Sequence, residues 1–196
     1  MNDDLAAGRA DARPDTRARI QAVALDLFTE QGYEGTSLRE IAERLGVTKA
    51  ALYYHFKSKE EIVDSFSADR LTRMDALIEW GRSQPEPHSA GFRRELLARY
   101  ADELHSGPFL KVMRFFHQNQ LAFKNQPAGT KMRDAIIDII GLLAEPGSAP
   151  TARLRAGMAV FALNTSWLLL QGEDITDEQR REAAMEVALD LIRDGD

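Results

Sequence analysis

The apolar positions of this chain follow the period of an α-helix almost throughout. In the first periodic stretch they recur every three or four residues, at Ile20, Val23, Ala24, Leu27 and Phe28. No segment alternates apolar and polar residues for long enough to make a β-strand. The pattern therefore predicts an all-α fold with roughly nine helices.

Capping signals and helix breakers divide this pattern into elements. Ser or Thr followed three residues later by Glu or Gln predicts helix starts at Ser37, Ser58 and Thr176. Thr48 can cap another helix, and Gly46 ends the helix before it. A break at 83–91 precedes further helices at about 92–106, 109–124, 128–144, 151–171 and 176–193, with breaks at 107–108, 127–129 and 145–150.

Residues 37–56 have the pattern of a helix-turn-helix, whose second helix enters the major groove of DNA. One apolar set can pack the two helices together: Ile41, Ala42, Leu45, Val47, Leu52 and Phe56. The outward positions then hold Lys49, Ala50, Tyr53, Tyr54 and His55. Polar tips on such aromatic residues suit contacts with phosphate. The alternative is a plain corner between two bundle helices, with Tyr53 and Tyr54 as core aromatics.

Charge is distributed unevenly along the 196 residues. The net charge of −6 divides into −2 for residues 1–12, +1 for 13–60 and −5 for 61–196. Residues 48–59 contain three lysines and no acid. An acidic body with a locally basic segment suits a protein that meets phosphate through one small surface.

Several classes of protein are disfavoured by what the sequence lacks. There is no cysteine and no apolar run of about 18 residues, so disulfides and membrane spans are not expected. The polar start does not suit a secretory signal, and a cytoplasmic protein is expected. Glycine-rich phosphate loops, nucleophile elbows and zinc-protease motifs are missing, and the histidines lack metal-ligand spacing. We therefore expect no enzyme activity, no cofactor and no metal.

The segment from about residue 18 to residue 63 resembles the DNA-binding domain of the tetracycline-repressor (TetR) family. The resemblance is carried by FTEQGY at 28–33, GTS at 35–37, LYYHF at 52–56 and KEE at 59–61. It implies a helix-turn-helix domain at 15–60, after a disordered lead-in at 1–14. A helical ligand-binding and dimerisation domain would follow at 61–196.

The resemblance also implies a role for each matching position. Lys49 and Ala51 would face bases, and Lys49 has the reach to contact guanine O6 or N7. Phosphate contacts would come from the following residues: Ser37, Arg39, Thr48 and Lys59. Tyr53, Tyr54 and His55 would form an aromatic face towards phosphates and base edges.

For the rest of the chain, the resemblance implies an effector cavity and a dimer interface. The candidate effector-binding residues are Leu104, Met113, Phe116, His117, Gln120, Asn164 and Trp167, and ordinary core packing is their alternative. The helix at 151–171 is apolar around most of its circumference, and the last helix has a stripe of small residues. The expected interface residues are Met158, Phe161, Ala184, Val187, Ala188 and Leu191.

The function that these expectations define is a homodimeric repressor. It would bind a palindromic operator in double-stranded DNA and release it when a small, largely apolar molecule binds. The alternative is a DNA-binding regulator without an inducer, controlled by a protein partner or acting constitutively.

Overall fold

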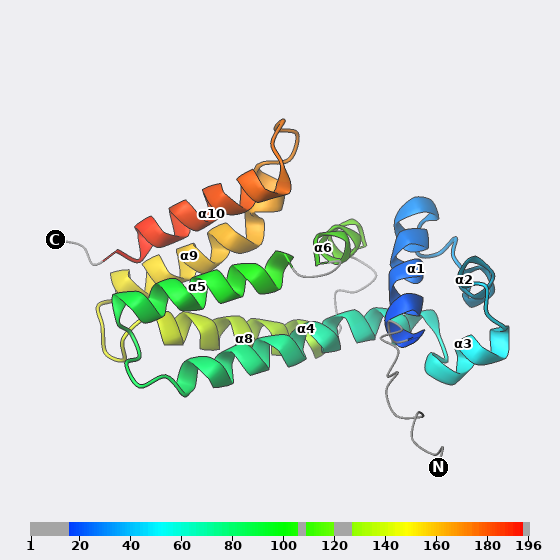
Figure 1. The fold of residues 1–196 in the computed structure, drawn as a ribbon, viewed down its shortest axis with the longest axis horizontal. Helices are drawn as coiled ribbons and strands as arrows, with labels where there is room; N and C mark the ends of the chain where they lie inside the picture. The colour runs from blue at the N-terminus through cyan, green and yellow to red at the C-terminus, as the bar shows by residue number, and fades with distance from the viewer. Residues whose placement is uncertain (1–15, 106–108, 120–126, 194–196) are drawn as a thin grey trace, which may run out of the picture. The chain divides into compact units, whose positions relative to one another are not determined.

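The computed structural model describes residues 16–105, 109–119 and 127–193. These ranges contain nine helices and no strand, which confirms the all-α prediction (Figure 1). None of the helices in these ranges is long and apolar enough to cross a lipid bilayer. The described residues form two compact units that divide between Ile62 and Val63. The predicted lead-in at 1–14 and the predicted break at 107–108 lie outside the described residues.

The N-terminal unit consists of three helices and the start of a fourth. They are α1 (Thr16–Gln31), α2 (Leu38–Leu45), α3 (Lys49–His55) and α4 (Lys59–Arg82). Five of the predicted apolar residues are fully withdrawn from solvent: Ile20, Ala24, Ile41, Leu52 and Phe56. The apolar pattern thus correctly predicted the small core that fixes α2 and α3 together.

The corner between α2 and α3 is determined by local hydrogen bonds. Ser37 and Glu40 form the predicted capping box, and Thr48 Oγ1 accepts a hydrogen bond from the backbone N–H of Ala51 at 3.2 Å. Gly46 ends α2 at φ 72°, in the left-handed region that glycine tolerates best. Val47 N–H then donates to the Ala42 carbonyl at 3.0 Å, which closes the turn.

The start of α4 differs slightly from a full capping box. Ser58 Oγ accepts from the N–H of Glu61 at 3.2 Å, as the spacing predicts. Glu61 Oε2, however, accepts from the N–H of Lys57 at 2.5 Å, one residue earlier than the box requires. The helix start is therefore confirmed, although only one half of the reciprocal pair forms.

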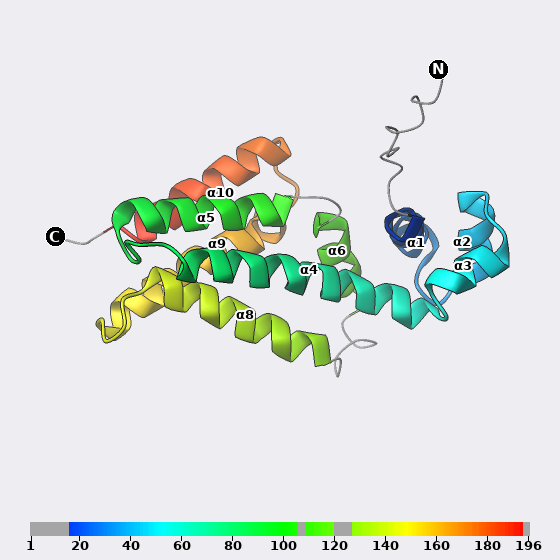
Figure 2. The ribbon, with the colours of Figure 1, turned by 60° about the horizontal axis from the view of Figure 1, so that its bottom comes forward.

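The C-terminal unit is a bundle formed by the rest of α4 and five more helices. These are α5 (Ala90–His105), α6 (Phe109–Gln118), α8 (Pro127–Leu143), α9 (Pro150–Leu169) and α10 (Asp177–Leu191). In both ribbon views α10 lies along α9 and beside α5 (Figures 1 and 2). The main hydrophobic cluster of the C-terminal unit contains residues of α4, α5, α8, α9 and α10. Leu96, Leu97, Tyr100 and Ile139 are among its fully buried members.

Two predicted helix breaks are helix starts in the structure. Pro127 and Pro150 are the first residues of α8 and α9. Proline fits this position because the N–H that it lacks would have no partner within the helix. The helix expected at 109–124 ends at Gln118, where the side chain of Asn119 donates to the Phe115 carbonyl at 2.8 Å. Residues 120–124 lie outside the described residues.

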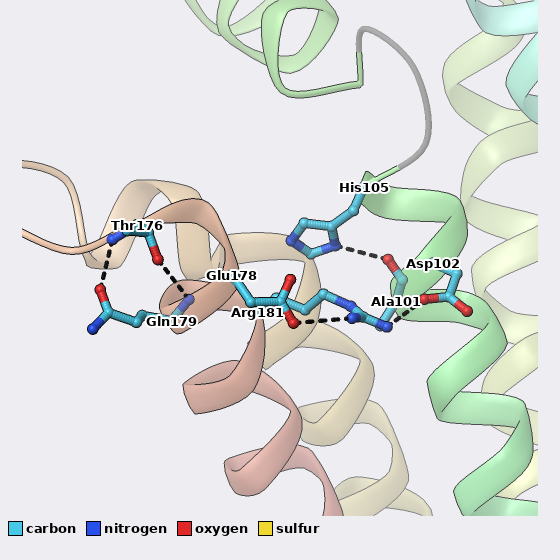
Figure 3. A network of polar contacts seen from close by, with 7 residues as sticks. All are labelled: Ala101, Asp102, His105, Thr176, Glu178, Gln179 and Arg181. Atoms are coloured by element: carbon cyan, nitrogen blue, oxygen red, sulfur yellow. Dashed lines mark hydrogen bonds and ion pairs between the residues drawn. The ribbon is translucent and has the colours of Figure 1, made fainter.

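Polar contacts join α10 to α5 (Figure 3). Arg181 reaches Asp102 on α5 and, on its own helix, Glu178 at 3.4 Å. The predicted capping box of Thr176 and Gln179 starts α10. These contacts fix the last helix at the side of the bundle that α5 forms.

Candidate nucleic-acid interface and effector site

Helix α3 presents most of its side chains to solvent. Leu52 is its one buried residue, and Phe56, which caps its end, is also buried. Tyr54 is 81% exposed, while Tyr53 and His55 are half-buried. Tyr54 is therefore not a core aromatic, and the corner between two bundle helices does not explain α3. An exposed helix of this kind, fixed by a buried second face, is the arrangement that a recognition helix needs.

Aromatic contacts organise the exposed face of α3. The ammonium of Lys49 lies over the ring of Tyr53, 5.3 Å from its centroid. The rings of Tyr54 and His55 meet edge to face at a centroid distance of 5.2 Å. Ala51, predicted to face bases beside Lys49, is exposed. All the predicted residues of α3 thus lie outside the core or at its edge.

Thr48 and Ser37, the two hydroxyl residues predicted to contact phosphate, differ in whether the hydroxyl hydrogen is already used in the folded chain. Thr48 Oγ1 acts as an acceptor in its cap, so its own hydrogen can still be donated to a phosphate. Ser37 accepts from the N–H of Glu40 and also donates its hydroxyl to Glu40 Oε2 at 2.7 Å. A phosphate must therefore compete with Glu40 for the hydroxyl of Ser37.

Local hydrogen bonds change the pKa values of two charged groups on α2, Arg39 and Glu40. Arg39 Nε donates to Glu43 Oε1 at 2.7 Å, and this hydrogen bond raises the pKa of the Arg39 guanidinium. The hydroxyl and backbone N–H of Ser37 lower the pKa of the Glu40 carboxyl. The side chain of Arg39 is 78% exposed, which leaves it accessible to DNA.

Tyr33 fixes the first turn of α4, a role that the sequence did not suggest. Lys59 Nζ donates to the Tyr33 carbonyl at 2.6 Å and lies 4.4 Å from the centroid of the Tyr33 ring. The Tyr33 hydroxyl donates to Glu60 Oε1 at 2.9 Å. An ammonium has three donors, so the bond to Tyr33 positions Lys59 and leaves two hydrogens for a phosphate. The pattern FTEQGY was the available signal, but it showed only that Tyr33 matches a family.

Lys57 is a second cation that the residue-by-residue expectations omitted. It is exposed, and its ammonium contacts the backbone carbonyl of Tyr53 at the end of α3. The run of three lysines at 48–59 was the signal for it. Lys57 therefore adds positive charge beside the exposed face of α3.

The predicted effector-binding residues are distributed over three helices of the C-terminal unit. Leu104 is buried, Trp167 is 9% exposed, and Met113, Phe116 and Asn164 are half-buried. Leu104 belongs to the main hydrophobic cluster, and Met113 packs against it. The side chain of His117 and the whole of Gln120 lie outside the described residues.

Asn164 belongs to a polar cluster within the bundle. Its Nδ2 donates to the hydroxyl of Tyr100 at 2.7 Å and to the Val160 carbonyl at 2.8 Å. Arg70, on α4, reaches Asn164 Oδ1 at 3.5 Å, and its Nε lies 3.3 Å from Met132 Sδ. Sequence periodicity could not find this cluster, because it shows which face a residue occupies and not which helix faces it.

The predicted interface residues of α10 differ in how far they are buried within the single chain. Ala184 and Ala188 are 6% and 0% exposed in the single chain, and Leu191 packs against the same core. The small side chains of Ala184 and Ala188 let α10 approach α9 within one protomer, which leaves these two alanines little surface for a partner, while half-buried Leu191 stays a predicted interface residue. Large apolar side chains do remain exposed on the two helices: Leu154, Met158, Phe161, Leu168, Leu169 and Val187.

In the ranges that the structure covers, no group of three His, Asp or Glu side chains is placed to hold a metal ion.

Comparisons with known proteins agree with this architecture. The family described as "Bacterial regulatory proteins, tetR family" matches residues 20–66. Tetracycline repressor protein class A from transposon 1721 of Escherichia coli is 32% identical over 188 residues, which are 88% of this chain and 86% of the repressor.

Solved structures show the same fold. A transcriptional regulator from Aquifex aeolicus VF5 superposes with a TM-score of 0.70 at 28% identity, over 90% of this chain and 99% of the other. SmeT, in a complex with triclosan, superposes with a TM-score of 0.63 at 22% identity, over 89% and 90% of the two chains. With a repressor of this similarity along nearly its whole length, the chain belongs to the TetR family of bacterial transcriptional regulators.

Proposed function

We propose that this protein is a homodimeric repressor that binds a palindromic operator through α2 and α3. The exposed face of α3, fixed from behind by Leu52, is the observation that carries the proposal. Lys49 and Ala51 face the bases in this proposal, and Arg39, Thr48, Lys57 and Lys59 hold the phosphates. Ser37 contributes chiefly as the cap of α2.

A palindromic operator needs two copies of the protein, and these copies associate through α9 and α10. Leu154, Met158, Phe161 and Leu168 recur at helical spacing on α9, and each is more than a third exposed. Val187 adds an exposed apolar side chain on α10. Exposed apolar side chains gathered along one helix are typical of an interface. A two-fold dimer also matches the symmetry of a palindromic site.

Release of DNA requires an effector that prefers a different arrangement of the two DNA-binding units. A dimer reads two half-sites whose centres are about 34 Å, or a multiple of that, apart. An effector bound in the C-terminal unit shifts the population away from this spacing when it binds the other arrangement more tightly. The relatives support this mechanism, since one is named a tetracycline repressor and another is a complex with triclosan.

The experiment is a selection of binding sites from a random library of DNA duplexes. The affinity for the most enriched sequence is then measured by fluorescence anisotropy. We expect an inverted repeat, bound by a dimer, with affinity that falls steeply as salt rises. Enrichment of no sequence would contradict the proposal. A thermal-shift screen of small molecules then separates effector control from the alternative of a regulator without an inducer, because only a binding ligand raises the melting temperature.

A further inference from the structure

A cleft opens at one end of the C-terminal unit, where α5 begins and α10 ends. Both ribbon views show these two helix ends gathered with the connection between α8 and α9 (Figures 1 and 2). The cleft has a volume of about 210 Å³, and α5, α8, α9, the α8–α9 loop and the end of α10 all line it. Arg93, which lines it, is eleven positions before the candidate effector residue Leu104 on α5, or about 16 Å along the helix axis. The cleft is therefore separate from the predicted effector-binding residues.

Three arginines and one acid line this cleft: Arg93, Arg155, Arg193 and Glu145. Arg155 is exposed and forms no hydrogen bond or ion pair with another described residue. Arg193 Nη2 lies 3.1 Å from Asp190 Oδ1, but both side chains are more than half exposed, and such surface pairs contribute little stability. Arg93 has interactions of its own within the chain. The positive charge available to a ligand therefore comes chiefly from Arg155 and Arg193.

The helix dipoles around the cleft largely cancel. Two helices begin there, α5 and α9, and two end there, α8 and α10. Helix starts favour anions and helix ends favour cations, so the side chains decide the sign of the site. The three arginines outnumber the acids even when Asp190 is counted beside Glu145. The excess charge is positive, and its complement is an anion.

The inner wall of the cleft is apolar. Leu143 and Ala156 line it and are each 2% exposed, and half-buried Ile192 lies beside them. A guanidinium binds a carboxylate through two parallel hydrogen bonds, while an apolar wall suits a hydrocarbon body. Pockets for drug-sized ligands start at about 300 Å³, so this cleft suits a smaller molecule.

We propose that this cleft binds a small organic acid, whose carboxylate is held by Arg155 and Arg193 and whose apolar part lies against Leu143 and Ala156. The site is additional to the effector site of the proposed function and does not depend on it. A ligand bound there connects the start of α9 to the end of α10, and it should raise the melting temperature, because it binds only the folded bundle.

The test is calorimetric titration of the full-length protein, without DNA, with hexanoate, benzoate and cinnamate and with their primary amides. We expect at least one acid to bind, and its amide to bind about tenfold more weakly, because the amide loses charge-assisted hydrogen bonds. Arg155→Gln and Arg193→Gln should each weaken binding of the acid by about three- to tenfold, and the double variant should weaken it further. Arg153→Gln is the matched control, since Arg153 is exposed on α9 and does not line the cleft.

Ala152→Phe tests the volume of the cleft instead of its charge. Ala152 lines the cleft and is half-buried, so a phenyl ring at this position should fill the space and abolish binding. This variant also carries the test should an arginine variant fail to fold.

Equal affinity for acid and amide would overturn the inference, as would failure of all three acids to bind. An unchanged affinity in the double arginine variant or in Ala152→Phe would show that the acid binds elsewhere. A loss in Arg153→Gln as large as that in Arg155→Gln would show that only the net charge matters, which also overturns the site. Because no DNA is present, these measurements decide the inference whether or not the protein binds an operator.

Discussion

The two units of this protein assemble their functional side chains in opposite ways. In the N-terminal unit, every proposed DNA contact comes from one stretch between Ser37 and Lys59. In the C-terminal unit, the polar cluster joins three helices, and Arg70 and Asn164 are 94 positions apart. The family match covers residues 20–66 and hence only the first kind of site. A contiguous site can be read from a motif, whereas a dispersed one becomes visible only when the helices are packed.

The largest expected effect comes from disrupting the proposed dimer interface. Phe161→Glu together with Val187→Glu places charges in the exposed apolar surface of α9 and α10. We expect monomers by light scattering, and operator affinity lower by about 10²- to 10⁴-fold, because the two half-sites are no longer bound together. Ile137→Glu is the control, since Ile137 is an exposed apolar residue on α8. An unchanged dimer mass would mean that the dimer interface lies elsewhere. It would also contradict the proposal that α9 and α10 bring two DNA-binding units together.

The next effect tests whether the contiguous site reads bases. Lys49→Ala should cost about 1–3 kcal/mol of binding free energy and relax the preference at one base position. Lys57→Ala is the matched control: it should weaken binding to all sequences alike, because Lys57 lies after α3 and would contact phosphate. Anisotropy on the selected operator and on single-base variants measures both. A uniform loss in the Lys49 variant would mean that this lysine is only a phosphate contact.

Lys59→Ala should reduce the slope of log affinity against log salt by about 1 per half-site. The structure adds a second expectation, because Lys59 also donates to the Tyr33 carbonyl and lies over its ring. The variant should therefore lose about 1–2 kcal/mol of stability, measured by urea denaturation. Lys59→Arg keeps the charge and should restore the salt slope. A wild-type slope in Lys59→Ala would contradict the phosphate role, whatever happens to stability.

The smallest effect is at the cap of α2. Ser37→Ala should destabilise the N-terminal unit by about 1 kcal/mol. Hydrogen bonds from Ser37 lower the pKa of Glu40 in the folded protein, so their stabilisation is present above the ordinary pKa of a glutamate and is lost as the pH falls through the lower folded value. The variant should therefore lose less stability on acidification than the wild type. Glu43→Gln is the control, and an identical acid dependence in wild type and Ser37→Ala would exclude this coupling.

Local signals predicted most of the helix boundaries and little of the packing. The capping boxes at Ser37 and Thr176 were correct because a cap is decided within four residues. The stripe of Ala184 and Ala188 is already buried within the single chain, because a stripe of small residues fits the approach of a helix of the same chain as well as that of a partner.

The functional residues divide in the same way. The sequence alone identifies Tyr100 only as one of several aromatic residues and Arg70 only as a charged residue on a helix face. Their partnership depends on how α4, α5 and α9 are placed together, which periodicity does not contain.

Helix α4 carries a practical consequence for the engineering of sensors. Lys59, which is fixed to Tyr33, and Arg70 stand on this one unbroken helix, and the two compact units divide within it, after Ile62. A chimera that joins this DNA-binding unit to a foreign sensor must therefore be spliced inside a helix. One residue too many at the splice would turn the sensor by about 100° about the helix axis, while seven extra residues restore its angle to within about 20°. Libraries of such hybrids should vary linker length in steps of a heptad rather than residue by residue.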